Sequence, residues 1–526
     1  MARHRTAVGR ALVLRGVRRL HGTLGRWLAI FAASLFAFLI RFLVPVPVGQ
    51  ADNRDGPRVM CGRPLGMGPV FRRGEPRFFR FIYFRYSASP SCHHHLPYPT
   101  SEMGPLLISR LLSPVFGLRG QLNLIALGIL MCAVAAFGIA TLVTGLRIRL
   151  RTQVLLAAVI WVIMADAAFF DVFASPFEEP AALNGLLLVA AGLVYLGRDK
   201  RATAFGLFVA GCGGFLAILS KEQYLILALP VCPALILASL NRNTAGQPWR
   251  KRFRDRQVGA AAAVAALLAL LAGAYAAWDA TSHYGQRLHH IQAVDTIFVD
   301  IVNGHDNERA DLRALGLPQS WAKYAGRYYW DRGSVRFNPH WQRYAAELTD
   351  TNVAKFWLTH PGRFLDVAQT AAIQAQRFRD VYLGTYAPSA GRKPGAYESR
   401  VVVVTWLMHQ LPAHLGLYGL LPLWLVMLAV ALVALLRRRL PWHRDASAVV
   451  LCLTVSAIVA FVPPGFFESI STTRHMVGSN LATVLSIPLS VGLVLSMIME
   501  AVKARRRRPV PPAPARPQVP QPAHRS

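Results

Sequence analysis

Residues 121–144 read QLNLIALGILMCAVAAFGIATLVT, and residues 145–152, GLRIRLRT, follow with three arginines. The first stretch holds no charged side chain over 24 residues. A helix of that length, at about 1.5 Å per residue, crosses the ~30 Å hydrocarbon core of a membrane. Arginines directly after such a span are typical of its cytoplasmic end. The stretch therefore predicts a transmembrane helix that ends inside the cell.

The same pattern recurs along the chain of 526 residues, of which 54% are hydrophobic and 16% charged. An average soluble domain is about a quarter charged, so a soluble globular protein is excluded. The sequence predicts an all-α polytopic membrane protein of about ten transmembrane helices. The predicted spans are 27–48, 121–144, 153–170, 180–196, 202–219, 225–240, 258–278, 414–436, 446–463 and 476–499.

The net charge of +32 follows the predicted topology. With the N-terminus inside, the cytoplasmic stretches hold 30 of the 58 Lys and Arg residues but only four of the 26 acids. This is the positive-inside rule, and arginine beside anionic lipid accounts for the charge without a nucleic-acid partner. We expect a multi-pass protein of the plasma membrane with both termini cytoplasmic.

The chain divides into a basic N-terminus (1–26), seven helices (27–278), an outer segment (279–413), three helices (414–499) and a basic, Pro-rich cytoplasmic tail (500–526). A second outer segment, 49–120, interrupts the first seven helices. We interpret 27–48 as a retained anchor and 401–412 as an interfacial helix, since twelve residues are short for a span. The large segments on one side place the activity at the outer face.

Two cysteines, Cys61 and Cys92, lie in the first outer segment, an oxidising location, and are candidates for a disulfide. The neighbouring histidines 93–95 are weak metal ligands, because consecutive side chains point in different directions on a regular backbone. A divalent metal ion as cofactor therefore stays open.

Acidic residues stand at the outer ends of several predicted helices. Asp52 and Asp55 follow the first span, and Glu102 precedes an amphipathic stretch, 105–116. Glu178 and Glu179 occupy the turn before Pro180, where ordinary helix capping explains them equally well. Asp166 lies inside the third span, where a hydrogen bond to a neighbouring helix suffices.

Basic residues stand at the same face. Lys221, one of only seven lysines, ends the fifth span, and Arg474 with His475 begins the tenth. Cationic donors at a helix start favour an anion such as a phosphate, although snorkelling or an ordinary basic turn is the alternative. Acids and cations on one membrane face suit transfer from a lipid-linked phosphate sugar. One carboxylate would take the acceptor's proton, and the cations would stabilise the departing phosphate.

An ordered set of short motifs resembles a known family, the GT-C superfamily of polyprenyl-phosphate-sugar glycosyltransferases, and within it the bacterial hexose transferases of the cell envelope. The matching pieces are Asp52-Asn53-Arg54-Asp55, SEMGPLLISRLL (101–112), SPFEEPA (175–181), SKEQY (220–224), DLRALGLP (311–318), His360-Pro361 and Arg474-His475.

The resemblance implies a GT-C-like helix bundle. It also implies a catalytic acid in the first outer loop, Asp52 or Asp55, and lipid-phosphate ligands at outer helix ends, which Lys221, Arg474 and His475 match. Glu102, Glu178 and Glu179 would be supporting acids. The activity expected is an inverting transfer of a sugar from a polyprenyl-phosphate donor to an envelope glycan or lipid-linked acceptor.

Two other functions fit part of the pattern. A glycan polymerase or ligase would also have many helices and a large late outer loop. A transporter of lipid-linked glycans would need polar residues deep in several spans, and the sequence offers little beyond Asp166 and Asn184.

Overall fold

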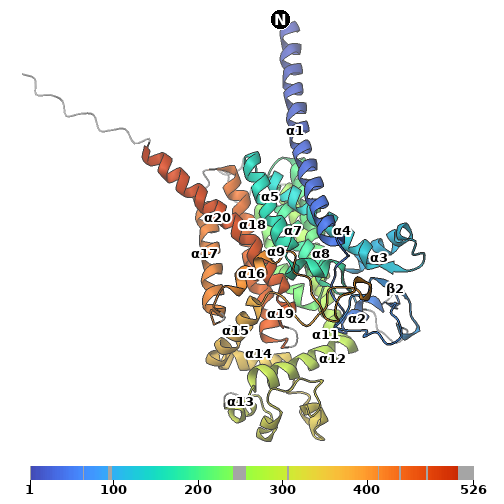
Figure 1. Ribbon diagram of the computed structural model, residues 1–526. Coiled ribbons are helices and arrows are strands. Elements are labelled where there is room, and N and C mark those ends of the chain that lie inside the picture. The colour runs from blue at the N-terminus through green and yellow to red at the C-terminus, as the bar shows by residue number, and fades with distance from the viewer. Residues whose placement is uncertain are drawn as a thin grey trace, which may run out of the picture.

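The computed structural model describes residues 2–62, 64–92, 98–240, 256–304, 307–412, 414–437, 440–469 and 472–506. Each of the ten predicted spans lies largely in helix (Figure 1). The corresponding elements are α1 (Ala2–Leu43), α4 (Leu124–Gly145), α5 (Leu150–Ala165) with α6 (Ala167–Phe170), α7 (Glu179–Leu193), α8 (Lys200–Ile218), α9 (Ala228–Ala238), α11 (Arg256–Thr281), α17 (Gly416–Arg437), α18 (Pro441–Phe466) and α20 (Val477–Arg506). The prediction of an all-α polytopic membrane protein is confirmed.

Fewer helices than ten are long enough to cross a membrane. Within the described residues, seven helices meet that length and composition, and the bent pair of α5 with residues 167–174 would be an eighth. The exceptions are α7, with 15 residues, and the pair of η4 (Glu222–Leu227) and α9. Every residue of α7 is buried, mostly against α8 and α4. Its apolar sequence therefore reflects burial in protein, which hydropathy does not distinguish from contact with lipid.

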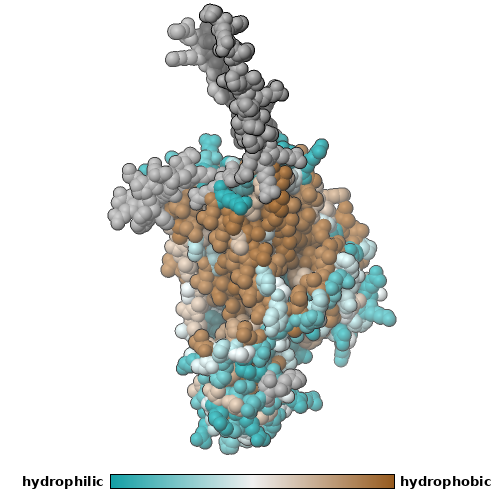
Figure 2. Space-filling view, turned by 90° about the vertical axis from the view of Figure 1, so that its left-hand side faces the viewer, coloured by the Kyte–Doolittle hydropathy of each residue, from teal (hydrophilic) through white to brown (hydrophobic). Residues whose placement is uncertain are grey.

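One face of the helix bundle carries an apolar band. Figure 2 shows it as a brown zone above a hydrophilic end. Large apolar side chains of the long helices are exposed, for example Phe208, Leu270 and Leu436, at 70%, 72% and 79%. Such contiguous exposure is unfavourable in water and indicates a surface in contact with lipid.

The two large segments between helices lie at one end of the bundle, and the N-terminus lies at the other (Figure 1). The first segment carries α2 (Gly56–Met60), η1 (Pro90–Cys92), α3 (Met103–Leu112) and η2 (Ser113–Phe116). A small antiparallel sheet of β1 (Met67–Pro69), β2 (Arg85–Ala88) and β3 (Leu122–Asn123) holds it together, with Met67 opposite Ala88 and Tyr86 opposite Leu122. α3 and η2 leave Leu111 and Val115 about 80% exposed, as expected of an interfacial helix (78% and 81%).

The second segment is mostly helical. It holds α12 (His283–Asp295), the π-helix η6 (Thr296–Ile301), α13 (Glu308–Ala314), η7 (Gln319–Tyr324), η8 (Val335–Phe337), η9 (Trp341–Tyr344), α14 (Asp350–Thr359), α15 (Pro361–Gln376), η10 (Pro388–Ala390) and α16 (Val403–His409). Trp321 and Trp341 are buried among other aromatic rings, so this segment has an apolar core of its own. α16 lies within the stretch 401–412, for which the sequence predicts an interfacial helix.

The two segments join through backbone hydrogen bonds. The amide of Ala51 donates to the carbonyl of Gly384 (2.9 Å), and the amide of Gly384 donates to Phe79 (2.8 Å). A Cβ at position 384 would lie 2.1 Å from the carbonyl oxygen of Arg80, so only glycine allows this approach. The first acidic loop is thereby fixed against the later segment.

Candidate active site

A cavity of about 670 Å³ lies where the two outer segments meet the helix bundle. Six parts of the chain line it: the first loop, the start of η4, α12, the turn at Trp330, the stretch at Tyr382 and the stretch around α19 (Thr472–His475). Three residues that the sequence singled out lie on its wall: Asp55, Lys221 and His475. These positions are up to 420 residues apart along the chain, so the cavity is a product of the tertiary fold.

Asp55 is paired with Arg474 inside this site. The carboxylate Oδ2 of Asp55 lies 2.5 Å from Arg474 Nη2, and the Asp55 side chain keeps 36% of its surface exposed. Arg474 is nearly fully buried, with Glu179 Oε1 3.6 Å from its Nε and the ring of Phe177 4.5 Å from its guanidinium carbon. Burial alone would raise the pKa of Asp55, but the charges of Arg474, Arg58 and Lys221 outweigh it and lower that pKa. Asp55 is therefore a partly exposed carboxylate in its ionised form.

Asp52 has a different position from Asp55. It is buried and does not line the cavity. Its Oδ1 accepts hydrogen bonds from the amides of Arg54 (2.7 Å) and Gly56 (2.9 Å), which closes a tight turn around Asp55. A Cβ at position 56 would lie 2.7 Å from Asp52 Oδ2, so this turn needs glycine there. Burial raises the pKa of Asp52 to about 6. This residue positions the loop, whereas Asp55 presents its carboxylate to the cavity.

Lys221 is buried without a hydrogen-bond partner for its ammonium. It stands at the break between α8 and η4 in an extended conformation, and only 1% of its surface is exposed. Its Nζ has no hydrogen-bond partner within the described part of the chain. The turn that carries it is held by Thr100, whose hydroxyl donates to the carbonyl of Ser220 at 2.6 Å. An unsatisfied buried ammonium is costly, and an anion entering the cavity would relieve that cost.

His475 contacts both an acid and Arg474. Its Nδ1 lies 2.5 Å from Glu468 Oε2, and its Nε2 accepts from Arg474 Nη2 at 3.0 Å. These neighbours place the ring proton on Nδ1. Burial, with the charge of Lys221, lowers the pKa of His475, whereas His475 helps to lower that of Glu468 to about 2 against the effect of burial. His475 is thus a buried ring held between Glu468 and Arg474, where it orients the Arg474 guanidinium.

Arg58 is a cavity residue that sequence reasoning missed. Its Nε lies 2.6 Å from Glu178 Oε1 and its Nη1 lies 3.8 Å from Glu222 Oε1. Glu222 also accepts a hydrogen bond from the hydroxyl of Tyr98 at 2.6 Å. The sequence held one signal for Arg58, its spacing from Asp55. Because α2 begins directly after Asp55, Arg58 lies three positions on, about one helical turn from Asp55.

Two acids cap helices outside the cavity. Glu102 is fully buried, its Oε2 accepts from the amide of Ala181 at 2.8 Å, and burial raises its pKa. Asp166 lies at the bend between α5 and α6 and accepts from the amides of Ala168, Val404 and Thr405. Both residues satisfy backbone donors at helix starts. These hydrogen bonds explain why an acid lies at this position in the bundle without a transport pathway.

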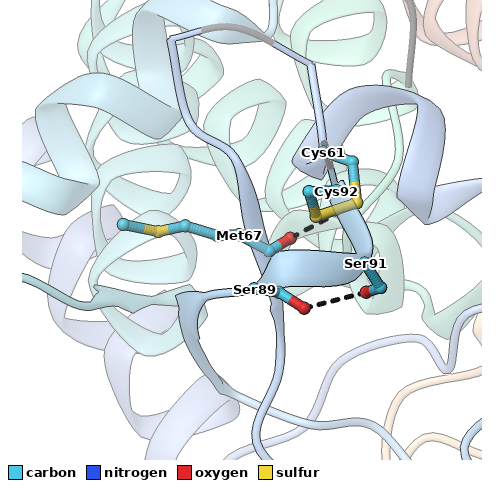
Figure 3. The surroundings of a disulfide bond; sticks show 5 residues. All are labelled: Cys61, Met67, Ser89, Ser91 and Cys92. Atoms are coloured by element: carbon cyan, nitrogen blue, oxygen red, sulfur yellow. Dashed lines mark hydrogen bonds between the residues drawn. A yellow bond between two sulfur atoms is a disulfide. The ribbon is translucent and has the colours of Figure 1, made fainter. Parts of the chain in front are cut away.

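Cys61 and Cys92, the candidate pair, form a disulfide bond (Figure 3). It ties the end of α2 to η1, close to the β1–β2 pair. Histidines 93–95 lie outside the described residues. Among the residues that are described, no group of three or more His, Cys, Asp or Glu side chains could hold a metal ion.

An apolar groove lies beside the polar cavity. It consists of two adjoining hollows of about 550 and 560 Å³ that share Ser101, Phe215 and Leu271. One hollow lies between α3, α4, α8 and α11 and has an almost wholly apolar lining. The other hollow reaches Tyr98, the residue whose hydroxyl bonds Glu222 on the cavity wall. Tyr98 therefore separates an apolar space among membrane helices from a charged space.

The fold and the site define a class: a polytopic helical membrane protein with a charged cavity at one end of its bundle and an apolar groove leading toward it. The chain belongs to the family described as the YfdI N-terminal transmembrane domain, whose model matches residues 18–472.

A solved structure of the archaeal oligosaccharyltransferase AglB from Archaeoglobus fulgidus, in complex with an inhibitory peptide and a dolichol-phosphate, matches with a TM-score of 0.34 and 12% identity. The match covers 92% of this chain, which spans about half (52%) of that protein. No curated protein matched.

Proposed function

We propose that this protein is an inverting glycosyltransferase that moves a sugar from a polyprenyl-phosphate donor to an envelope glycan or lipid-linked acceptor at the outer face of the membrane. The observation that carries this proposal is Lys221, a buried ammonium on the cavity wall without a hydrogen-bond partner among the described residues. The neighbouring cations are engaged: Arg58 with Glu178, and Arg474 with Asp55. Lys221 is therefore the cation best suited to receive the donor phosphate.

Asp55 supplies the carboxylate for the reaction. In the proposed step, the acceptor oxygen forms a bond to the anomeric carbon while the bond from that carbon to the phosphate oxygen breaks. The acceptor's proton passes to Asp55, and the electron pair of the broken bond leaves with polyprenyl phosphate. A single carboxylate acting on the acceptor corresponds to inversion at the anomeric carbon.

Arg474 links the base to the leaving group. It pairs with Asp55 before the donor binds, which keeps the pKa of that carboxyl low. A donor phosphate that attracts Arg474 would weaken this pair, and the pKa of Asp55 would then rise toward that of a useful base. The same guanidinium would stabilise the charge on the departing phosphate.

The groove beside Tyr98 supports a lipid donor. Its apolar lining between membrane helices suits a polyprenyl chain, and it ends where the charged cavity begins. The family match and the ordered GT-C motifs also favour this class of enzyme.

The test measures polyprenyl phosphate released by the purified full-length protein. The substrates are a polyprenyl-phosphate hexose and the envelope glycans of cells that lack the protein. Lys221→Met, which keeps the apolar stem, should lower kcat/KM for the donor about 10- to 150-fold, since a charge-assisted contact contributes about 1.5 to 3 kcal/mol. Lys221→Arg should retain part of the activity.

Lys393→Ala, which changes an exposed lysine outside the cavity, is the matched control and should transfer normally. Normal donor use by Lys221→Met would refute the assigned role of this lysine. A wild-type protein that releases no polyprenyl phosphate from any polyprenyl-phosphate hexose would refute the proposed function.

A further inference from the structure

The helix α12 forms one wall of the cavity with a single face. Its cavity-lining residues are Tyr284, Arg287, Leu288, Ile291, Gln292 and Asp295. Successive members are three, one, three, one and three residues apart, which is the period of one α-helical face. The whole length of α12 therefore lies along the cavity, from Tyr284 at its beginning to Asp295 at its end.

The two ends of α12 lie beside different parts of the cavity. Tyr284 lies against Tyr98, with ring centroids 5.8 Å apart, and Tyr98 contacts Glu222 next to Lys221. The apolar groove, which includes Tyr98, lies next to this end of α12. Asp295 stands eleven residues further on, about 16 Å along a helix axis at about 1.5 Å per residue. The second end is therefore separated from the lipid entrance by most of the cavity.

The distant end combines an aromatic ring with polar side chains. Trp330 lines the cavity there and keeps 53% of its surface exposed. The amide of Tyr329, its neighbour, donates to Asp295 Oδ1 at 2.5 Å, so the carboxylate is bonded to the stretch of backbone that carries Trp330. Gln292 lies one helical turn before Asp295 on the same face. The guanidinium of Arg336 covers Trp330 at 5.1 Å and fixes the ring.

This combination suits a sugar ring. A pyranose has a C–H face that packs against an indole, and hydroxyl groups at its edge that bond a carboxylate and an amide. Few placed polar groups on an otherwise apolar wall are typical of small-ligand sites. α12 carries one cavity cation, Arg287, toward its Tyr284 end, and the buried cations Lys221 and Arg58 lie on other elements, at η4 and α2.

Resting on the proposed function, we infer that Gln292, Asp295 and Trp330 form the acceptor subsite, which binds the pyranose ring of a glycan acceptor and directs its hydroxyl toward Asp55. The donor lies at the Tyr284 end, with its phosphate at Lys221. The α12 wall thereby decides which acceptor is used, whereas the groove and the cations decide which donor is used.

α12 is firmly anchored for such a role. His289 lies between two carboxylates, with Asp350 Oδ2 2.7 Å from its Nδ1 and Asp279 Oδ2 2.7 Å from its Nε2. The helix is thus tied to the end of α11 and the start of α14. A recognition surface needs this rigidity, because a loosely held wall would lose specificity.

The experiment measures initial rates of transfer from a polyprenyl-phosphate hexose while the amount of extracted envelope glycan is varied, and then while the donor is varied. Trp330→Ala and Asp295→Asn should each raise the half-saturating amount of acceptor about tenfold or more, a factor equivalent to about 1.4 kcal/mol. The KM for the donor should stay within about twofold of wild type, which also shows that the variants are folded. Trp330→Phe, which keeps an aromatic face, should recover most of the acceptor affinity.

Phe337→Ala is the matched control, because Phe337 is an exposed aromatic residue of the same segment (61%) that does not line the cavity. Unchanged acceptor saturation in both test variants, or a rise confined to the donor KM, would overturn the acceptor subsite alone. A wild-type protein that uses no polyprenyl-phosphate hexose would overturn the proposed function, and the subsite with it.

Discussion

Exchanging Asp55 for asparagine should almost abolish transfer, whereas the same exchange at Asp52 should leave most of it. Asp55 presents a partly exposed carboxylate to the cavity. A positioned general base contributes about 100- to 10,000-fold. We therefore expect Asp55→Asn to lower kcat by about two to four orders of magnitude at saturating donor and acceptor.

The expected difference between the two acids follows from their hydrogen bonds. Asp52 uses one oxygen, Oδ1, to accept from the amides of Arg54 and Gly56. Asparagine offers the same oxygen, so the turn around Asp55 can persist. The exchange also removes a buried charge, since burial raises the pKa of Asp52 to about 6. Asp52→Asn should therefore keep its activity within about tenfold of wild type, the equivalent of about 1.4 kcal/mol.

The assay is release of polyprenyl phosphate, quantified by mass spectrometry, with thermal unfolding measured on the same preparations. Asp55→Asn weakens the pair with Arg474, for which we expect about 1 to 3 kcal/mol of destabilisation. This is less than for a fully buried pair, because Asp55 is partly exposed and Glu179 still lies near Arg474. Equal activity of the two folded variants, or a larger loss in Asp52→Asn, would refute the assignment of Asp55 as the base.

Three further predictions concern stability. Replacing Cys61 and Cys92 with serine removes a crosslink between residues 31 positions apart, which should destabilise the first outer segment by about 3 to 4 kcal/mol and raise its amide exchange; unchanged exchange would contradict this. Because burial raises the pKa of Asp52 from 3.8 to about 6, its contribution to stability is complete below about pH 4 and lost as the pH rises through 6, a loss of about 3 kcal/mol. The Tm of Asp52→Asn should therefore rise relative to wild type between pH 4 and 7, and a constant difference would count against this. Arg58→Met leaves Glu178 buried without its partner and should cost about 3 to 5 kcal/mol in thermal unfolding, much of which the added exchange Glu178→Gln should restore.

The sequence alone determined the kind of protein. Runs of apolar residues predict membrane helices because the hydrocarbon core imposes the same length requirement on every span. The distribution of arginines predicts the two outer segments, and both lie at one end of the bundle (Figure 1). The apolar runs overestimated the number of full-length spans, because α7 is apolar through burial in protein.

Residue type and local spacing also selected Asp55, Lys221 and His475, which line one cavity. They could not separate Asp55 from Asp52, because the two acids differ in whether the carboxylate accepts hydrogen bonds from the backbone amides of its own turn, as that of Asp52 does.

The tertiary structure decided what each side chain faces. Arg58 and Glu178 are 120 positions apart, and Arg474 and Asp55 are 419 apart, so no local pattern reports either pair. Only the fold leaves Lys221 without a hydrogen-bond partner among the described residues, and only the fold turns one face of α12 toward the cavity. The physical reason is that membrane insertion depends on the composition of each segment, whereas the charge, pKa and partners of a site depend on atoms brought together from distant segments.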